Sequence, residues 1–221
     1  MLNQGVLNSI LTEQAYVTNS TQTPDQSTYT FSSQSIGVAD SFRHVIVGVG
    51  FYDGTNSMSD GDGPASVTVG GVSATLINQE SVGSGSERFG ASLWRAHVPT
   101  GTTADVVVVL PETVSGCNVG IHRLIHASGA PRDSDAVRVS TTTATTKSFS
   151  ASKAGIGYAI LREDGAAASS TWGGTASPTE EYDDTPLGFN MFTSASFTDA
   201  GTVQVSGTGI DHISLVAAVW S

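Results

Sequence analysis

Short runs of β-branched and aromatic residues, separated by polar turns, follow one another from residue 28 to the end of the chain. The run 42–51, FRHVIVGVGF, is long and apolar enough for a central strand. Gly70-Gly71, a dipeptide suited to the positive φ angles of a tight hairpin turn, joins two such runs. We expect strands at residues 28–32, 42–51, 66–69, 72–78, 91–98, 104–110, 118–126, 137–142, 147–151, 156–162, 189–197, 203–206 and 212–220, and a loop-rich segment at 165–185. This spacing is typical of a sandwich or a barrel, and we expect an all-β fold, a jelly-roll-like antiparallel β-sandwich.

The first residues follow a different pattern. Apolar side chains recur at helical spacing within residues 1–17, which predicts a short amphipathic helix. The polar run 18–27, which contains Pro24, is typical of a linker or extended arm. We therefore expect an N-terminal anchor at 1–27 and one sandwich domain at 28–221, with no internal sequence repeat. The apolar positions of the anchor, which we expect to dock on a partner, are Leu2, Val6, Leu7, Ile10 and Leu11.

Composition fits a strand-rich chain and narrows its partners. Charged residues make up only 13% of the 221 residues, and the formal net charge is −11. Such a chain repels phosphate backbones, so nucleic acid is not an expected partner. We find no signal peptide and no apolar run long enough to span a membrane. The single cysteine, Cys117, is expected to be a small buried side chain. The apolar run 212–220, HISLVAAVW, needs a position inside a sheet.

Three segments together carry a resemblance. They are VTVGGVSATLI (67–77), ASLWRAHVPTGTTADVVVVL (91–110) and DHISLVAAVW (211–220). In order and spacing this chain resembles the β-sandwich virion proteins of tailed bacteriophages, which occur as capsid decorations, head fibres or spikes, and tail appendages. The resemblance implies a non-enzymatic structural protein on the virion surface, made in the host cytoplasm. It also implies capsid or tail subunits as partners, homo-oligomers, and no catalytic residues or cofactor.

An acidic loop is the candidate metal site. Asp53, Asn56, Asp60 and Asp62 lie among glycines, and clustered oxygen ligands of this kind suit calcium. Their spacing is not that of a helix-loop-helix calcium site. The alternative is a solvated polar loop, which is also the alternative for the acidic run 180–184.

Loop aromatics beside polar residues are the candidate glycan sites, because sugars stack on exposed rings and hydrogen-bond to neighbouring carboxylates and amides. Tyr52 has Asp53 and Asn56 close in sequence, and Trp172 precedes Glu181, Tyr182 and Asp183. The alternative is that each ring packs inside its own loop. A carbohydrate-binding module for host surface glycans is therefore the second functional hypothesis.

Enzymatic signals are weak. His122 and His126 are four residues apart, which on a strand places them too far apart to share one metal ion. We expect both to be partly exposed strand histidines. Asp211-His212 has no accompanying G-x-S-x-G motif, and no P-loop or dinucleotide fingerprint is present. A glycan hydrolase is the third hypothesis, and it would need two carboxylates about 5 to 10 Å apart in a cleft.

Overall fold

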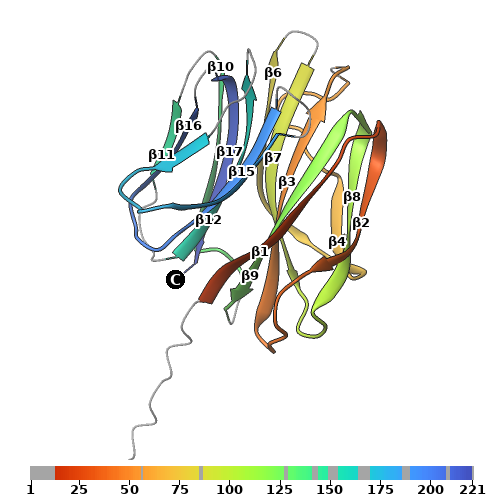
Figure 1. The fold of residues 1–221 in the computed structure, drawn as a ribbon, viewed down its shortest axis with the longest axis vertical. Coiled ribbons are helices and arrows are strands. Elements are labelled where there is room, and N and C mark those ends of the chain that lie inside the picture. The colour runs from red at the N-terminus through yellow and green to blue at the C-terminus, as the bar shows by residue number, and fades with distance from the viewer. Residues whose placement is uncertain are drawn as a thin grey trace, which may run out of the picture.

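The computed structural model describes residues 13–55, 57–84, 87–126, 129–140, 144–148, 154–163, 170–185, 190–207 and 210–220. Every regular element among them is a β-strand, and all strand pairs are antiparallel (Figure 1). The all-β antiparallel sandwich predicted from the sequence is confirmed. No helix in this part of the chain is long and apolar enough to cross a membrane.

The chain builds two halves, one after the other. The N-terminal half contains β1 (Glu13–Gln22), β2 (Gln26–Ser35), β3 (Arg43–Asp53), β4 (Ser66–Val69), β5 (Val72–Ser73), β6 (Thr75–Ser84), β7 (Glu87–His97), β8 (Thr103–Val114) and β9 (Gly116–Ile125). The C-terminal half contains β10 (Asp133–Ser140), β11 (Ala144–Ser148), β12 (Ala154–Glu163), β13 (Ser170–Gly173), β14 (Thr179–Asp184), β15 (Asn190–Phe197), β16 (Thr202–Gly207) and β17 (Ile210–Trp220).

Each half is a jelly roll with the same strand order. The N-terminal half has an inner sheet β1-β9-β3-β7-β6 and an outer sheet β2-β8-β4-β5. The C-terminal half has an inner sheet β10-β17-β12-β15-β14 and an outer sheet β11-β16-β13. When each half is numbered from its own first strand, the two orders coincide except for the two-residue strand β5. The chain therefore contains two sandwiches, where the sequence predicted one.

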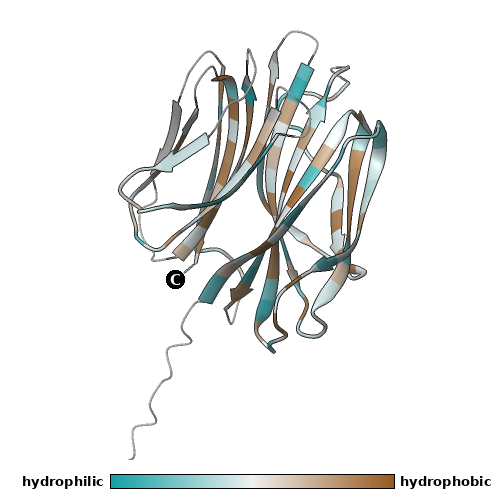
Figure 2. Ribbon diagram, viewed as in Figure 1, coloured by the Kyte–Doolittle hydropathy of each residue, from teal (hydrophilic) through white to brown (hydrophobic). Residues whose placement is uncertain are grey.

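The four sheets stack as layers, with the two inner sheets face to face in the centre (Figure 1). Three apolar cores separate them. On β3, Val45, Val47 and Val49 face the outer sheet, whereas Ile46 faces the C-terminal half. Both faces of an inner strand are therefore buried, which explains the nearly continuous apolar run that the sequence shows. In Figure 2 the hydrophobic positions lie along the strands, and hydrophilic ones gather towards the strand ends and turns.

Glycines in the N-terminal inner sheet make room for aromatic rings from the C-terminal half. A Cβ at Gly48 would lie 2.0 Å from the ring of Tyr158, and one at Gly50 would lie 2.4 Å from the ring of Phe192. A Cβ at Gly120 would lie 2.5 Å from the hydroxyl of Tyr182. The two inner sheets therefore interlock, with small residues on one side and large ones on the other.

The contact between the halves is reciprocal. Strand β6 packs against β10, and its counterpart β14 lies beside β1, the counterpart of β10. The central strands β3 and β12 contact each other. Counterpart strands thus meet at both edges, as in a two-fold arrangement, but β6 packs closely on β10, whereas β14 reaches β1 mainly through side chains. Here the arrangement arises within one chain.

The N-terminal prediction needs correction. Residues 13–17, expected in a helix, belong to β1, and residues 18–22, expected in a linker or arm, continue that strand. β1 pairs with β9 from Glu13↔Ile125 to Gln22↔Cys117. Local periodicity misled the prediction because the partner strand lies about a hundred residues away. The five predicted docking residues, Leu2, Val6, Leu7, Ile10 and Leu11, lie outside the described residues.

Candidate functional site

The acidic loop after β3 is organised around a buried carboxylate. The Asp53 side chain is fully buried, and it accepts hydrogen bonds from the backbone N–H groups of Thr55 (2.8 Å), Ser57 (2.7 Å) and Met58 (3.0 Å). The hydroxyls of Thr55 (2.8 Å) and Ser57 (3.0 Å) donate to it as well. Burial by itself would raise the pKa of this carboxyl group, but these hydrogen bonds lower it below the ordinary value. Asp53 therefore holds the loop in shape.

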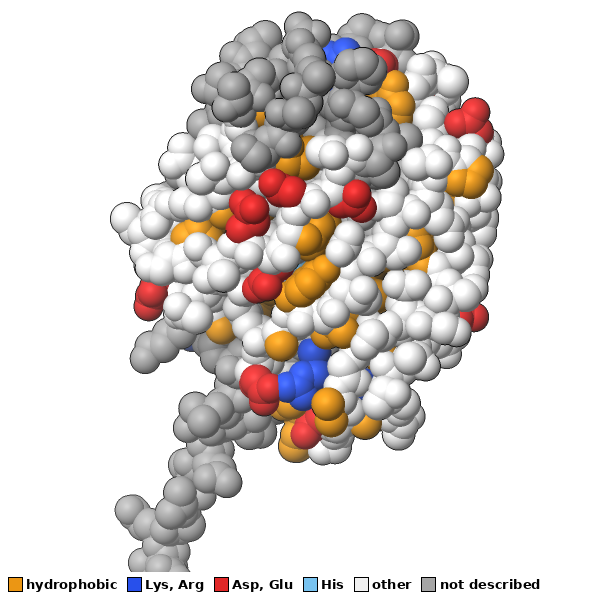
Figure 3. All heavy atoms as spheres, in the orientation of Figure 1, with side chains coloured by type: hydrophobic (Ala, Val, Ile, Leu, Met, Phe, Trp, Pro, Cys, Tyr) orange, Lys and Arg blue, Asp and Glu red, His pale blue; other side chains and the backbone are white. Residues whose placement is uncertain are grey.

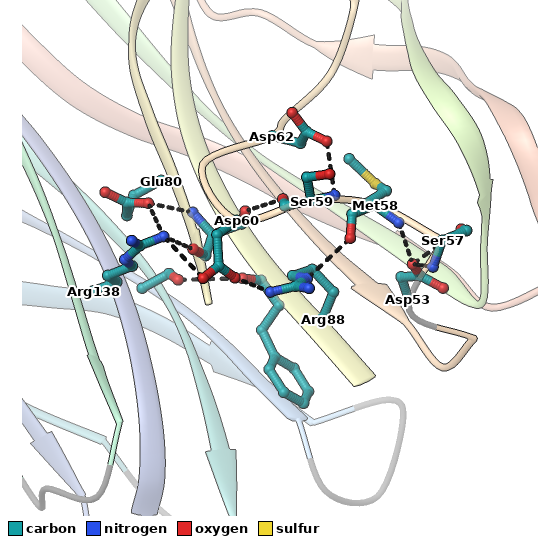
Figure 4. A network of polar contacts seen from close by, with 12 residues as sticks. Asp53, Ser57, Met58, Ser59, Asp60, Asp62, Glu80, Arg88 and Arg138 are labelled. Atoms are coloured by element: carbon teal, nitrogen blue, oxygen red, sulfur yellow. Dashed lines mark hydrogen bonds and ion pairs between the residues drawn. The ribbon is translucent and has the colours of Figure 1, made fainter. Parts of the chain in front are cut away.

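Asp60 joins the two halves (Figure 4). It pairs with Arg88 of β7, and its second oxygen lies 3.4 Å from Nη1 of Arg138 on β10. Arg138 also lies 3.6 Å from Glu80 of β6. The charges of Asp60 and Glu80 are thus balanced by the two guanidinium groups.

The predicted calcium ligands are not brought together. Asp53 is used by its own loop, Asp60 by the two arginines, and Asp62 accepts a 2.7 Å hydrogen bond from the backbone of Ser59. Asn56 lies outside the described residues. No group of three or more acidic, histidine or cysteine side chains suited to a metal ion occurs in the described part of the chain.

Tyr52 is part of the junction between the halves. Its ring stacks on Phe89 at 5.5 Å, and its hydroxyl donates to Glu87 (2.8 Å). Burial and the bond to Glu87 raise the pKa of Tyr52 to about 12. Arg162 of the C-terminal half pairs with the same Glu87 at 2.8 Å and lies over the Phe89 ring. Phe89 therefore covers one face of the Tyr52 ring, and that face is closed to a sugar.

Trp172 is a core residue. Its side chain is 7% exposed, and the indole N–H donates to Thr193 (2.8 Å). Thr193 contacts the hydroxyl of Ser170 (2.9 Å), which donates in turn to Asp183 (2.6 Å) and Glu180 (3.3 Å). Burial and the neighbouring Asp183 raise the pKa of Glu180. The sequence predicted a Trp172 platform beside acidic residues; the structure links them by hydrogen bonds but buries the ring.

Tyr182 belongs to a polar seam that the sequence did not reveal. The side-chain oxygen of Asn118 accepts from Tyr158 (2.5 Å) and from Tyr182 (3.0 Å). Its amide donates to Thr21 (2.6 Å), and Thr21 donates to Asp184 (2.5 Å). Burial raises the pKa of both tyrosines well above the ordinary value. This seam joins β9 and β1 of one half to β12 and β14 of the other.

His122 of β9 is the least expected buried group. It is 0% exposed, and within the described residues neither ring nitrogen has a hydrogen-bond partner. Its ring meets Tyr16 edge-on at 5.5 Å. Burial lowers the pKa of His122 to about 3. The prediction of a partly exposed strand histidine is wrong at His122 because both faces of β9 are covered.

Comparison with known proteins adds no family. No family model matches the chain, and neither a curated protein nor a solved structure is significantly similar to it. The site must therefore be interpreted from its own geometry. In that geometry the polar side chains singled out from the sequence mainly join the two jelly rolls or support the loops between strands.

Proposed function

We propose that this chain is a structural protein of a phage-like virion: a capsid decoration, a spike or fibre subunit, or a tail appendage, without enzymatic activity. It docks on capsid or tail subunits, or on copies of itself, through its N-terminal segment and displays the double jelly roll outward. The observation that carries the proposal is that the polar side chains bond to other parts of the same chain. Asp60, Glu87 and Asn118, each a group that could have bound a ligand, instead connect one half to the other.

Surface charge supports a display role. The face in Figure 3 is mostly uncharged, with scattered acidic side chains and few basic ones. With a net charge of −11, copies crowded on one particle repel one another and remain soluble. Double jelly rolls joined by three apolar cores form a stiff body suited to projection from a surface.

The proposal is tested by removing the anchor while keeping β1. Residues 1–12 are deleted, because β1 begins at Glu13 and its loss would expose β9. Full-length and shortened proteins are compared by light scattering, by thermal unfolding, and by binding to particles stripped of the protein. A point variant, Leu7→Asn, keeps the length and the charge of the segment and replaces one apolar side chain with a polar one.

The proposal predicts that both variants keep the wild-type unfolding temperature but lose assembly or particle binding. Unchanged assembly and binding would overturn docking by this segment. Surface glycans are the alternative ligand, and a glycan-binding screen of the full-length protein would then be the next measurement. Binding there would favour the carbohydrate-binding hypothesis over the virion one.

A further inference from the structure

The connection between the two halves is held at both ends by specific contacts. On the N-terminal side, the backbone N–H of His126 donates to Phe42 (3.2 Å). On the C-terminal side, the N–H of Arg132 donates to Val219 (2.8 Å). Between them, the carbonyl of Gly129 accepts the indole N–H of Trp220 (3.0 Å). His126 is thereby joined to Phe42, directly before β3, while Gly129 and Arg132 are joined to β17.

The ring of His44 packs against this connection at Gly129. Gly129 lies directly on the His44 ring, since a Cβ at Gly129 would come within 2.1 Å of the ring carbon Cε1. Gly129 also has a φ of +60°, so a larger residue would be strained there as well as crowded. The His44 side chain is only 8% exposed. The contact of Trp220 with Gly129 therefore depends on an imidazole that remains compact and uncharged.

The ionisable groups that act on His44 are all basic. His97 lies directly opposite His44 in the β3–β7 pairing, with ring centroids 4.9 Å apart. Arg95, two residues earlier on β7, and His126 also raise the local positive potential. Trp220 and Gly129, which pack against the cluster from the C-terminal side, carry no ionisable side chain. A proton on His44 would meet three other bases and no carboxylate among the groups that influence it.

We infer that His44 is an acid-sensitive latch, which keeps Gly129 in place on Trp220 at neutral pH and releases it when the His44 imidazole becomes protonated. The released state exposes residues 129–132 and the end of β17 while the sandwiches remain folded. Through this latch, acid would loosen the contact between the two halves. This property goes beyond the proposed display role and does not depend on it.

The size and sign of the effect follow from titration of His44. Burial, followed by the charges of His97, Arg95 and His126, lowers the pKa of His44 from 6.5 to about 4. In the released state the ring is hydrated and regains the ordinary pKa, so the closed state loses stability as the pH falls from about 6.5 towards 4. Between about pH 7.5 and pH 5 the released fraction is expected to rise about 30-fold.

Hydrogen exchange on the full chain measures this release. The indole N–H of Trp220 and the backbone N–H of Arg132 are followed by NMR at both pH values, and each rate is divided by its intrinsic rate at that pH. The corrected rates should rise about 30-fold at the lower pH, with much smaller changes in the centre of β3. A uniform change across the molecule would mean global destabilisation and would overturn the latch.

Two variants separate the latch from other acid effects. His44→Phe keeps a flat ring but cannot take up a proton, so it should abolish the acid acceleration at Trp220 and Arg132. The matched control, His122→Phe, removes another buried histidine that lies on the seam with Tyr16, and it should leave the acceleration unchanged. Persistence of the acceleration in His44→Phe would overturn the proposal.

A direct titration covers the case in which His44→Phe does not fold. In the wild-type chain, the ring resonances of His44 should titrate near pH 4 and those of Trp220 and Gly129 should shift with them. Titration of His44 near pH 6.5, or titration without a response at Gly129, would show that the ring does not support the connection.

Discussion

The two jelly rolls share one strand order but present opposite surfaces to each other. The N-terminal inner sheet offers glycines at its centre, whereas the C-terminal inner sheet offers Tyr158, Phe192 and Tyr182. Two copies of the N-terminal surface would leave gaps at the glycines, and two copies of the C-terminal surface would crowd their rings. The backbone arrangement is therefore symmetric, while the side chains favour pairing of unlike halves.

The two edges of the contact differ in their chemistry as well. At the β1/β9–β14 seam, Asp184 is partly buried and receives hydrogen bonds from Thr21 and Asn118. At the corresponding β6–β10 edge, Asp60 and Arg138 form ion pairs with about half of each side chain exposed. Water and salt weaken exposed pairs much more than enclosed hydrogen bonds. We therefore expect the first seam to contribute more to stability.

The strongest test of the complementary surfaces is Gly48→Ala. The new methyl group would overlap the Tyr158 ring, and we expect the free energy of unfolding to fall by about 3 kcal/mol. Gly173→Ala is the matched control, because nothing lies within 4 Å of a Cβ there; it should change stability by less than about 0.5 kcal/mol. Urea unfolding measures both. Equal losses would show that Tyr158 does not require the space at Gly48.

The next largest effect concerns the buried histidine of the β1/β9 seam. The folded-state pKa of His122 is about 3, below its unfolded value of 6.5, so its contribution makes the protein less stable as the pH falls from 6.5 towards 3. At about pH 5 this amounts to about 2 kcal/mol. His122→Phe should recover that amount at pH 5 relative to its effect at pH 7.5. An equal effect at both pH values in urea unfolding would contradict burial of a neutral ring.

The smallest expected effect is a difference between the two seams in how salt changes the stability lost on mutation. Asp184→Asn should cost about 1 kcal/mol at low and at high salt, because enclosed hydrogen bonds are lost. Asp60→Asn should cost less than about 1 kcal/mol at low salt and close to nothing in about 1 M sodium chloride. Thermal unfolding of both variants at the two salt concentrations provides the comparison. Equal salt dependence would remove the distinction between the seams.

Short sequence matches appear once the halves are aligned by strand order. Thr68-Val69-Gly70-Gly71 ends β4, and Thr171-Trp172-Gly173-Gly174 covers the end of its counterpart β13. Asp-Gly stands at the end of β3, at 53–54, and the same dipeptide occurs in the sequence at 164–165, directly after β12. These matches are short and widely separated, so they do not form a continuous repeat. The side chains of the two halves differ, and each half packs against a different surface.

The sequence alone determined the features that depend on neighbouring residues. Alternation and β-branched runs placed most strands, and the Gly70-Gly71 hairpin is confirmed by Val69↔Val72 pairing with positive φ at both glycines. The apolar run at the C-terminus is confirmed as β17, an interior strand between β10 and β12. Cys117 is buried, as expected. Each of these follows from backbone preference or burial at a single segment.

Only the tertiary structure decided which segments meet. The pairing of β1 with β9, the stacking of two jelly rolls, and the meeting of Asn118 with Tyr158 and Tyr182 join residues far apart in the chain. The candidate binding residues Tyr52, Asp60 and Trp172 acquired structural contacts for the same reason. Alternation shows that one face of a strand is covered, and a continuous apolar run shows that both are. Many different partners can provide that cover. The choice among them is made by long-range packing, which a local pattern does not encode.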